Sequence, residues 1–558
     1  MKNHFLYSLG FCLIFLFLSA CKETPKSAAT DETTTTAATE KTTTPFLKGT
    51  YFEGANGVFF DDKDHLNVAS VTGRKIGVVN TETGEIIKKY GPAEGIEGPD
   101  DLTFGPDGSL YHTSILTGEV GRRTPSGEVT KQMVAPGVNP ITFSDDGRLF
   151  VALDFSGDGL YELDSELKNP PRLILKELGW LNGMDFGPDG LLYGPIWSKG
   201  HIVKIDVDKA ELTVIVDDLT TPAAVKFDSK GNIFTVDHNT GIVWKIDPKT
   251  GDKVEIARGF SGADNLALNS KDELFVSSAQ DGGIFQVNMD GTHRVIQENS
   301  FCNAGDIAII GNQLFVPDIL SLKSFDKNTG APNPTQRHMI GVPGLIGPFT
   351  IDHANDQLAL TSWFSNEVQV WNAKEDKQTA LYHDFMVPMN AIFSEDALVV
   401  AELGLEPGKA KISRQIGEKR EVLMDAAKGL AVPAGLAASN GNIYVSDFYT
   451  GVVYQITENR EVLAAPKVII KDLQQPEGLK IGPKGNLLVV ETGANQVLSI
   501  DLSSGKKSVL ADNIPLGLQS APNLPPTWKI SEVDYDEQGN LYVPSDVENS
   551  IYKIEKVF

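Results

Sequence analysis

The sequence predicts an all-β protein made of tandem β-propellers, with two six-bladed rings of four-stranded blades. The first observation is an internal repeat: an apolar-x-Phe segment, three turn residues and a Gly-x-Leu-aromatic-Val segment recur along the chain. The second is the spacing of this unit, about 43 residues, which is typical of propeller blades. The third is that short apolar strands alternate with turn signals, without a convincing amphipathic helix. The apolar residue after the turn marks twelve units: Leu66, Leu110, Leu149, Leu192, Ile233, Leu274, Leu314, Leu358, Leu398, Ile443, Leu487 and Leu541.

Each unit is predicted to contain four strands. Residues 183–186 illustrate the first strand, which ends at the turn Pro188-Asp189-Gly190. Asp-Gly supplies the left-handed backbone that a tight hairpin requires. The second strand has a Leu-Tyr-Val character, residues 242–247 alternate as a third strand should, and residues 253–257 illustrate the fourth. A β-sandwich or a solenoid is the alternative architecture.

The number of strands at the two ends of the chain predicts how the rings close. Residues 47–52 form a strand before the first full unit, and the chain ends on a third strand at residues 551–554. We expect the opening strand to complete blade six, and residues 292–297 to open the second ring and complete blade twelve. The rings then span residues 46–290 and 291–558. One twelve-bladed ring satisfies the same count, but propellers typically have four to eight blades.

The N-terminus predicts an exported protein. Lys2 and His4 precede an apolar run at residues 6–18, and small residues follow, which is typical of a signal peptide at residues 1–20. Leu18-Ser19-Ala20-Cys21 resembles the lipobox of bacterial lipoproteins, which implies a lipid on Cys21 and a membrane anchor. Residues 21–45 are rich in Thr and predict a disordered tether. Lys22-Glu23 resembles a surface-export tag, so we expect an extracytoplasmic location at the outer membrane or cell surface.

Charge and cysteine content exclude some partners. The formal net charge of −25 argues against nucleic acid and against an anionic membrane surface as partners. Cys12 is predicted to leave with the signal peptide and Cys21 to carry lipid, so Cys302 has no partner for an intramolecular disulfide.

Oxygen-bearing side chains recur where the first strands begin. In a blade, the start of strand one and the end of strand two lie on the same face, here called the mouth. The residues at this place in the first ring are Asn56, Asp100, Asn139, Asn182, Ala223 and Asp264. Convergent carboxylate and amide oxygens suit Ca²⁺ or another divalent cation, and Asp100, Asn182 and Asp264 are the predicted metal ligands. Asn56 and Asn139 are predicted to bind substrate. The alternative is that these side chains only cap turns.

Histidine and tryptophan are also predicted near the first mouth. His112 and His238 follow second strands and are the candidate general bases, and His201 opens a third strand. Trp197 is the candidate for stacking on a sugar or an apolar ligand, and Trp363 and Trp528 lie in similar loops. A structural role between blades is the alternative for each of them. The second ring offers a poorer set at its mouth, consisting of Gly347, Ala434, Glu477 and Ser531.

Acidic residues after the second strands recur in so many blades that we predict a local turn-capping role for them. They are Asp237, Asp318, Glu402, Asp447, Glu491 and Asp546.

The blades resemble two known groups of propellers. Residues 181–193 (LNGMDFGPDGLLY) are similar to the strand that carries a metal-binding asparagine in the gluconolactonase-like, or senescence-marker-protein, group. Residues 443–453 resemble an NHL repeat. The first resemblance implies a metal held by glutamate, asparagine and aspartate: Asn182 matches the asparagine, and Glu53 loosely resembles the glutamate. Ala223 replaces the aspartate, and Asp264 lies one blade further on. Streptogramin-lyase-like propellers are another similar group, but their histidine-glutamate-histidine constellation has no clear counterpart here.

Two functions follow from these observations. The first is an envelope-anchored propeller that binds a small ligand or a protein partner at a propeller mouth, with a divalent cation in the first ring as an option. The second is a metal-dependent hydrolase of lactones or sugar derivatives, in which His112 or His238 moves protons. The sequence leaves open whether the protein is an enzyme.

Overall fold

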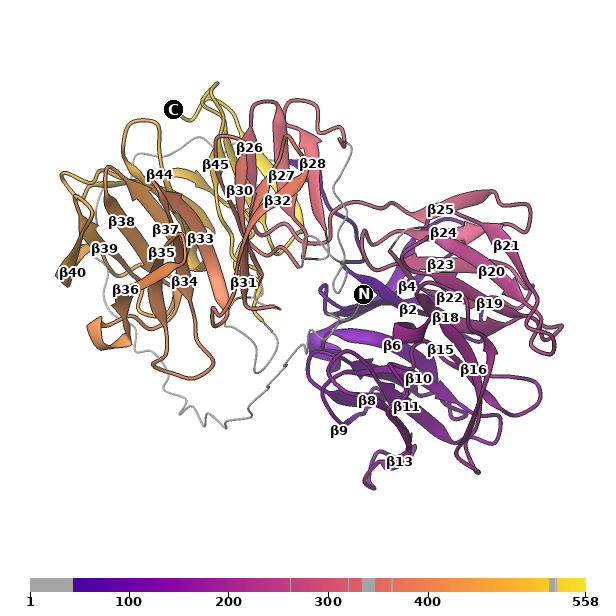
Figure 1. Ribbon diagram of the computed structural model, residues 1–558. Coiled ribbons are helices and arrows are strands. Elements are labelled where there is room, and N and C mark those ends of the chain that lie inside the picture. The colour runs from indigo at the N-terminus through magenta and orange to yellow at the C-terminus, as the bar shows by residue number, and fades with distance from the viewer. Residues whose placement is uncertain are drawn as a thin grey trace, which may run out of the picture.

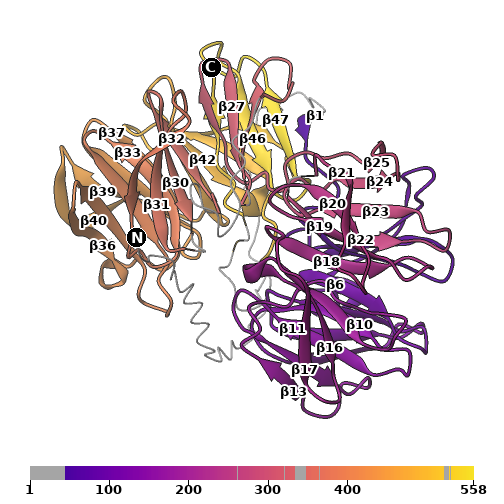
Figure 2. The same ribbon diagram turned by 45° about the vertical axis from the view of Figure 1, so that its right-hand side comes forward.

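The computed structural model describes residues 44–260, 262–319, 321–333, 347–362, 365–520, 527 and 529–558. These residues form twelve antiparallel sheets, eleven with four strands and one with three. The sheets are the blades of two six-bladed rings, which lie side by side (Figure 1, Figure 2). The predicted all-β architecture of tandem propellers is confirmed.

The first ring contains six blades of consecutive strands, each paired with the next along the chain. They are β2 (Ala55–Phe60), β3 (Leu66–Ser70), β4 (Lys75–Val79) and β5 (Ile86–Tyr90); β6 (Pro99–Phe104), β7 (Leu110–Ser114), β8 (Glu119–Arg123) and β9 (Val129–Met133); β10 (Val138–Phe143), β11 (Leu149–Leu153), β12 (Gly159–Leu163) and β13 (Arg172–Lys176); β14 (Asp185–Phe186), β15 (Leu192–Ile196), β16 (His201–Asp206) and β17 (Glu211–Val216); β18 (Pro222–Phe227), β19 (Ile233–Asp237), β20 (Ile242–Ile246) and β21 (Lys253–Ala257); and β22 (Ala263–Leu268), β23 (Leu274–Ser278), β24 (Ile284–Val287) and β25 (His293–Gln297).

The second ring contains the other six sheets, and the strand at the start of the chain belongs to its last blade. The strands are β26 (Ala308–Ile310), β27 (Gln313–Pro317) and β28 (Leu322–Asp326); β29 (Ile351–Ala354), β30 (Gln357–Ser362), β31 (Glu367–Asn372) and β32 (Lys377–Tyr382); β33 (Pro388–Ser394), β34 (Ala397–Glu402), β35 (Lys411–Ile416) and β36 (Lys419–Asp425); β37 (Pro433–Ser439), β38 (Asn442–Asp447), β39 (Val452–Glu458) and β40 (Glu461–Ile470); β41 (Pro476–Ile481), β42 (Leu487–Glu491), β43 (Gln496–Ile500) and β44 (Lys507–Asp512); and β45 (Asp534–Tyr535), β46 (Leu541–Ser545), β47 (Ser550–Ile554) and β1 (Pro45–Lys48).

Four short 3-10 helices lie in the connections. They are η1 (Pro92–Glu94), η2 (Trp197–Lys199), η3 (Ala426–Lys428) and η4 (Thr492–Ala494). Within the described ranges, no helix has both the length and the apolar character to span a bilayer.

The hydrophobic core lies between successive blades. The second strand of each blade is fully buried in most cases, as in β3, where all five residues are buried. Phe150 of blade three, for example, packs against Met184, Leu192 and Val203 of blade four. The turns that connect the strands follow the predicted chemistry, since Gly190 of the Asp-Gly turn adopts φ +77°. Repeated side-chain packing therefore joins the sheets into a ring.

The prediction of how the rings close is wrong. β1 pairs with β47 and completes the last blade of the second ring, where Leu47 lies opposite Ile551. Figure 2 shows β1 beside β47. β25 pairs with β24 instead, so blade six is complete without a borrowed strand. The first ring therefore extends to Gln297, and residue 290 lies in the turn before β25 rather than at the boundary.

Packing, rather than strand exchange, closes the first ring. Phe52, Val58 and Val68 of its first blade form one core cluster with Phe275 and Ile284 of its sixth blade. Because blade six already has its own outer strand, the N-terminal strand is free to pair elsewhere. It covers the exposed edge of β47, which would otherwise present unpaired backbone groups.

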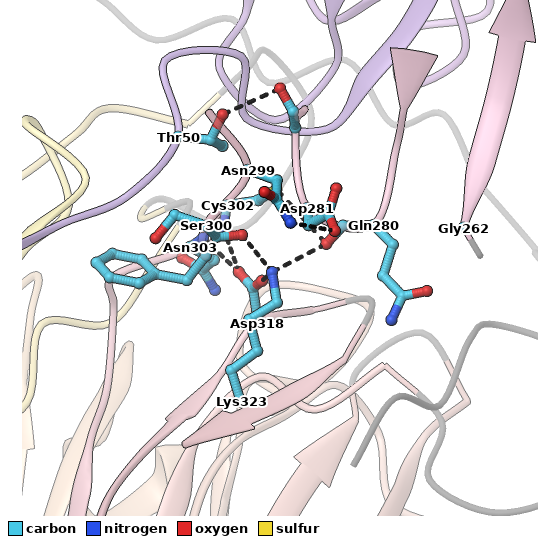
Figure 3. Close-up of polar contacts among 12 residues, drawn as sticks. Thr50, Gly262, Gln280, Asp281, Asn299, Ser300, Cys302, Asn303, Asp318 and Lys323 are labelled. Atoms are coloured by element: carbon cyan, nitrogen blue, oxygen red, sulfur yellow. Dashed lines mark hydrogen bonds and ion pairs between the residues drawn. The ribbon is translucent and has the colours of Figure 1, made fainter. Parts of the chain in front are cut away.

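The rings meet at a polar junction built from the loop before β24 and the segment that leads to β26. Lys323 Nζ lies 2.7 Å from a carboxylate oxygen of Asp318 and donates to the carbonyl oxygen of Gln280 at 3.2 Å. Figure 3 shows these contacts, and it shows the Gln280 carboxamide pointing away from them. Cys302 is a buried free thiol in the same junction. Thr50 Oγ1, on the segment after β1, donates to the Gly282 carbonyl oxygen at 3.0 Å.

Glu53 also belongs to this junction. Its carboxylate lies 3.1 Å from Lys529 Nζ of the second ring and 3.3 Å from Lys75 Nζ of the first. Lys529 is fully buried. The two lysines outweigh the effect of burial and lower the pKa of the Glu53 carboxyl, which stays ionised. Glu53 is thus a buried ion-pair partner, and its loose resemblance to a lactonase metal ligand has no counterpart in its contacts.

Candidate ligand site at the mouth of the first ring

The predicted mouth residues lie in β-bulges of the innermost strands. The pairing of β6 with β7 shifts register between Pro99 and Leu102, and Asp100 lies in that interval. β2, β10, β18 and β22 have equivalent shifts. A bulge re-aims the side chains of a strand and is common next to functional sites. The residues that these shifts contain are Asn56, Asp100, Asn139, Ala223 and Asp264.

Three carboxyl groups come close together at this mouth, and we call Asp100, Asp154 and Asp264 the acid cluster. Asp154 is fully buried, Asp100 is 3% exposed and Asp264 is half-buried. Burial, and then the charge of Asp101, raise the pKa of Asp100 to about 7, against the effect of a hydrogen bond from Asn56. Burial first, and then the charge of Asp100, raise the pKa of both Asp154 and Asp264 well above its usual range.

The acid cluster has amide donors but no cationic partner. Asn56 Nδ2 donates to Asp100 Oδ1 at 2.8 Å, and Asn139 Nδ2 donates to Asp154 Oδ2 at 2.7 Å. Asp154 Oδ1 is buried and receives no hydrogen bond from any described residue. Among the ion pairs that the described residues form, none involves these three carboxyl groups. The side-chain amides of Asn56 and Asn139, which were predicted to bind substrate, are thus hydrogen-bonded to carboxyl groups of the acid cluster.

A second polar layer in the same ring is neutralised. Lys226 Nζ lies 3.9 Å from a carboxylate oxygen of Asp185. The charge of Lys226 also acts on Asp101, whose carboxylate accepts hydrogen bonds from the backbone N–H groups of Leu102 and Ile141. Asp101 therefore joins two neighbouring blades. Asp101 thus has a nearby lysine and backbone donors, whereas the described residues provide no cation for the acid cluster.

The second ring repeats this neutralised layer. Lys480 Nζ lies 3.3 Å from Asp352 and 3.6 Å from Asp534, and Lys480 and Lys226 both lie in the fifth blade of their ring. A partly buried lysine beside aspartates is thus a shared structural feature of the two rings.

Aromatic side chains stand beside the acid cluster, and we call Phe155, Trp180 and Trp197 the aromatic rim. The ring centroid of Phe155 lies 5.4 Å from that of Trp180 and 5.6 Å from that of Trp197. All three are partly exposed. Phe155 and Trp180 have positive φ values of 51° and 69°, a conformation that bulky residues rarely adopt and that is common at binding sites. Trp197 therefore lies at the mouth, as predicted.

The aromatic rim and the acid cluster are physically connected. Phe155 directly follows Asp154 in the chain. On the other side, Trp197 lies 4.9 Å from the His238 ring, and His238 Nδ1 is 2.8 Å from the carbonyl oxygen of Ala263, which precedes Asp264. The two groups thus form one continuous arc around the mouth.

The histidines differ from one another. His238 lies at the mouth, where burial lowers its pKa to about 4. The prediction that His112 follows its strand at the mouth is wrong: His112 lies inside β7, and a Cβ atom on Gly121 of β8 would come within 2.1 Å of its ring. Burial lowers the pKa of His112 to about 3, and it is neutral at physiological pH. His201 opens β16 and is half-buried.

Asn182 does not join the acid cluster through any contact that the structure describes. Its side-chain oxygen accepts a hydrogen bond from the Gly183 backbone at 2.7 Å, and its own backbone N–H donates to Pro195. Over the described part of the chain, no group of three or more His, Cys, Asp or Glu side chains is placed to hold a metal ion. No described contact thus brings Asn182 together with Asp100 and Asp264, the other two predicted metal ligands.

The mouth of the second ring is different in character. Five buried apolar side chains form one cluster there: Ile319, Phe349, Met389, Ala434 and Ile530. Glu477 is buried and accepts a hydrogen bond from the Ser531 backbone at 2.6 Å. Trp363 and Trp528 lie outside the described residues. Glu477 lies in the register shift of β41, burial raises its pKa well above the usual range, and its Oε1 accepts no hydrogen bond from a described residue. The second mouth thus combines this buried carboxyl group with the apolar cluster, whereas the first mouth holds several polar side chains.

The recurrent acids after the second strands cap loops, as predicted. Asp237 accepts hydrogen bonds from the backbone N–H groups of Thr220 and Thr221, both at 2.8 Å. Asp318, Glu402, Asp447, Glu491 and Asp546 bind backbone N–H groups in the same manner.

Sequence reasoning missed Asp154, Phe155 and Trp180, although the repeat contains a signal for the first of them. Asp154, Trp197 and His238 each lie five residues after the marker of their blade, which is Leu149, Leu192 and Ile233 respectively. Three neighbouring blades thus place a polar or aromatic side chain at one equivalent position. No periodic signal identifies Phe155 or Trp180.

Comparison with known proteins gives only distant likenesses. No protein-family model matches the chain, and no curated protein matches it. A virginiamycin B lyase from Staphylococcus aureus is 17% identical over 48% of this chain and 93% of its own, with a TM-score of 0.37. The extracellular domain of a protein assigned as a hybrid two-component system from B. thetaiotaomicron is 10% identical over 91% and 82%, with a TM-score of 0.32. A protein assigned as a gluconolactonase is 12% identical over 47% and 95%, with a TM-score of 0.36. The blades themselves, rather than these likenesses, show that the chain has a β-propeller fold.

Proposed function

We propose that this protein is an envelope-anchored propeller that binds a small molecule at the mouth of the first ring. The observation that supports it is the acid cluster, which has no cationic partner among the described residues and lies next to the partly exposed aromatic rim. Burial raises the pKa values of its carboxyl groups, and strongly shifted carboxyl groups gathered in one place are common at functional sites. The second ring, whose mouth contains the apolar cluster, acts in this proposal as the support for the first.

The mouth is tested by a small-molecule screen that uses ligand-induced thermal stabilisation as its readout. Ligands of the mouth are expected to raise the melting temperature of the wild type and to lose most of that effect in Trp197→Leu. The matched control is Trp244→Leu, because Trp244 lies in β20 and is not part of the aromatic rim. Ligands that stabilise Trp197→Leu and Trp244→Leu equally would show that they bind away from the aromatic rim.

The anchor is proposed from the lipobox-like segment and is tested separately. Cys21→Ser is expected to move the protein from the membrane fraction to the extracytoplasmic soluble fraction, because the residue that accepts lipid is lost. Immunoblots of cell fractions and metabolic labelling with a palmitate analogue report the change. Cys302→Ser is the control and should leave the labelling unchanged, since Cys302 is buried in the junction. Labelling that survives Cys21→Ser would contradict the proposal.

The second candidate is a metal-dependent hydrolase of lactones or sugar derivatives. The acid cluster favours it, because a divalent cation such as Ca²⁺ would stabilise the ionised form of carboxyl groups whose pKa values are raised by burial. In this candidate Asp100, Asn182 and Asp264 hold the metal, which would polarise a carbonyl group. His238 would exchange protons through Nε2, since Nδ1 faces a backbone carbonyl oxygen.

The hydrolase candidate predicts stoichiometric metal in the purified protein. Elemental analysis is expected to show one divalent cation per chain in the wild type and its loss in Asn182→Ala. Asn56→Ala also removes an amide at the mouth and provides the comparison. If the metal persists in Asn182→Ala, or if protein without metal binds ligands normally, the hydrolase candidate is rejected and only the binding function remains.

A further inference from the structure

We infer that the ligand of the first mouth carries an organic ammonium group, with its charge at Asp264 and its carbon substituents against the aromatic rim. This inference rests on the proposed function and specifies the class of ligand. It follows from three features of the mouth: the sign of its charge, the type of side chain beside that charge, and the depth of each carboxyl group.

The sign of the charge requires a cation. Asp100, Asp154 and Asp264 influence one another electrostatically, and the described residues supply no lysine, arginine or protonated histidine to pair with them. Asp154 Oδ1 is fully buried and has no hydrogen-bond donor among the described residues. In the free protein the raised pKa values favour the protonated carboxyl groups, and a cation at the mouth stabilises their ionised form, which an anionic or a neutral ligand does not. A cation at the mouth stabilises all three groups at once.

The aromatic rim selects an organic cation. The faces of indole and phenyl rings attract positive charge that is spread over methyl or methylene groups. Several aromatic rings in this protein already have a lysine of the same chain over their face. Lys253 Nζ lies 5.3 Å from the ring centroid of Trp244, and Lys245 Nζ lies 5.5 Å from that of Phe234. Among the described residues, no lysine or arginine lies over Phe155, Trp180 or Trp197. These three rings are thus available to a cation from outside the chain.

The depth of the carboxyl groups fits an ammonium better than a metal ion. A divalent cation needs several oxygen atoms in direct contact. Here only Asp264 of the three is partly exposed, while Asp100 and Asp154 are buried and accept hydrogen bonds from asparagine amides. An ammonium needs one direct carboxylate contact, and the two deeper charges add to its attraction without touching it.

The test compares a cation with its uncharged isostere. Choline and 3,3-dimethyl-1-butanol differ in one atom, quaternary nitrogen against carbon, so their difference in affinity measures the effect of charge. Isothermal titration calorimetry with the full chain is expected to show that choline binds at least about tenfold more tightly than the alcohol. Its affinity should also fall as salt concentration rises. Benzyltrimethylammonium is a second cationic probe, with a ring that can stack on the rim, and Ca²⁺ is a third probe.

Matched variants locate the effect. Asp264→Asn is expected to reduce the affinity for choline about tenfold or more, whereas Asp62→Asn, an exposed aspartate of the same ring, should leave it unchanged. Trp197→Leu should lower the affinity for choline, whereas Trp244→Leu should leave it unchanged. Circular dichroism and melting temperature confirm that each variant is folded.

The outcomes separate this inference from the proposed function. Equal binding of choline and the alcohol, or binding of Ca²⁺ but of neither ammonium probe, overturns the ammonium class while the mouth remains a binding site. Failure of both ammonium probes at millimolar concentration, while the screen yields ligands sensitive to Trp197→Leu, also overturns the class alone. Absence of any ligand sensitive to Trp197→Leu overturns the proposed function itself.

Discussion

Replacing Phe46 and Leu47 by alanine is expected to destabilise the second ring by about 4 kcal/mol, because each removes a large apolar side chain from a packed position. Both residues pack on the cluster that contains Ile309, Leu314 and Ile551, where the first and last blades of this ring meet. The ring centroids of Phe46 and Tyr542 are 6.1 Å apart. β1 is therefore the strand that closes the second ring, although it lies at the other end of the chain.

Hydrogen exchange measures this effect ring by ring. Amides of β46, β47 and β26 should lose protection in the double variant, while amides of β22 to β25 should keep it, because the first ring closes through its own strands. Ile87→Ala is the matched control, since Ile87 lies on the outer strand β5 and is 43% exposed. Loss of protection in β24 and β25 would instead support closure of the first ring by the N-terminal strand.

Raising the pH from about 4 to about 8 is expected to lower the free energy of unfolding of the ligand-free protein, with Asp100 as a main cause. The folded state raises the pKa of Asp100 to about 7, so between these values the folded chain binds a proton that the unfolded chain has released. The stabilising effect of Asp100 is greatest below its unfolded pKa and is lost as the pH rises through about 7, a change of roughly 4 kcal/mol for this residue alone.

Denaturant titrations over this pH range provide the measurement. Asp100→Asn is expected to flatten the profile and to be more stable than the wild type at the alkaline end, because asparagine keeps an oxygen acceptor for Asn56 and carries no charge. The groups that face Asp100 are Asn56, Asp101, Asp154 and Asp264, and the two last have pKa values raised in the same direction. Asp62→Asn is the control and should follow the wild-type profile. A wild-type protein that becomes more stable toward pH 8 would show that the acid cluster is neutralised by a group from outside the chain.

The repeat was readable from sequence because a blade is a local object. Its four strands are consecutive, its turns need Asp-Gly or Pro-Asp-Gly, and its apolar residues recur with the period of the blade. For the same reason the mouth positions of the first ring could be predicted, since Asn56, Asp100, Asn139 and Asp264 occupy a fixed place in each repeat, at the start of the innermost strand.

Ring closure and the aromatic rim were not readable in this way. The backbone of residues 45–48 could pair with any open strand edge. Its pairing with β47 depends on which apolar side chains meet between the first and last blades of the second ring. His112 occupies a strand end in the pattern but lies under a neighbouring strand, because Gly121 leaves space for its ring. Phe155 and Trp180 carry no periodic signal and become neighbours only when blades three and four are packed together.

The sequence by itself determined the blades of this protein, their number, and the sign of the charge at the first mouth. These properties depend on local hydrogen bonding and on residue types that recur with the repeat. Tertiary structure alone decided which edge β1 covers, which lysines neutralise Glu53, and that Asp154 has no cationic partner among the residues that the structure describes. The physical reason is that pairing between distant charges and strand edges depends on distances across blades, which the order of residues along one blade does not specify.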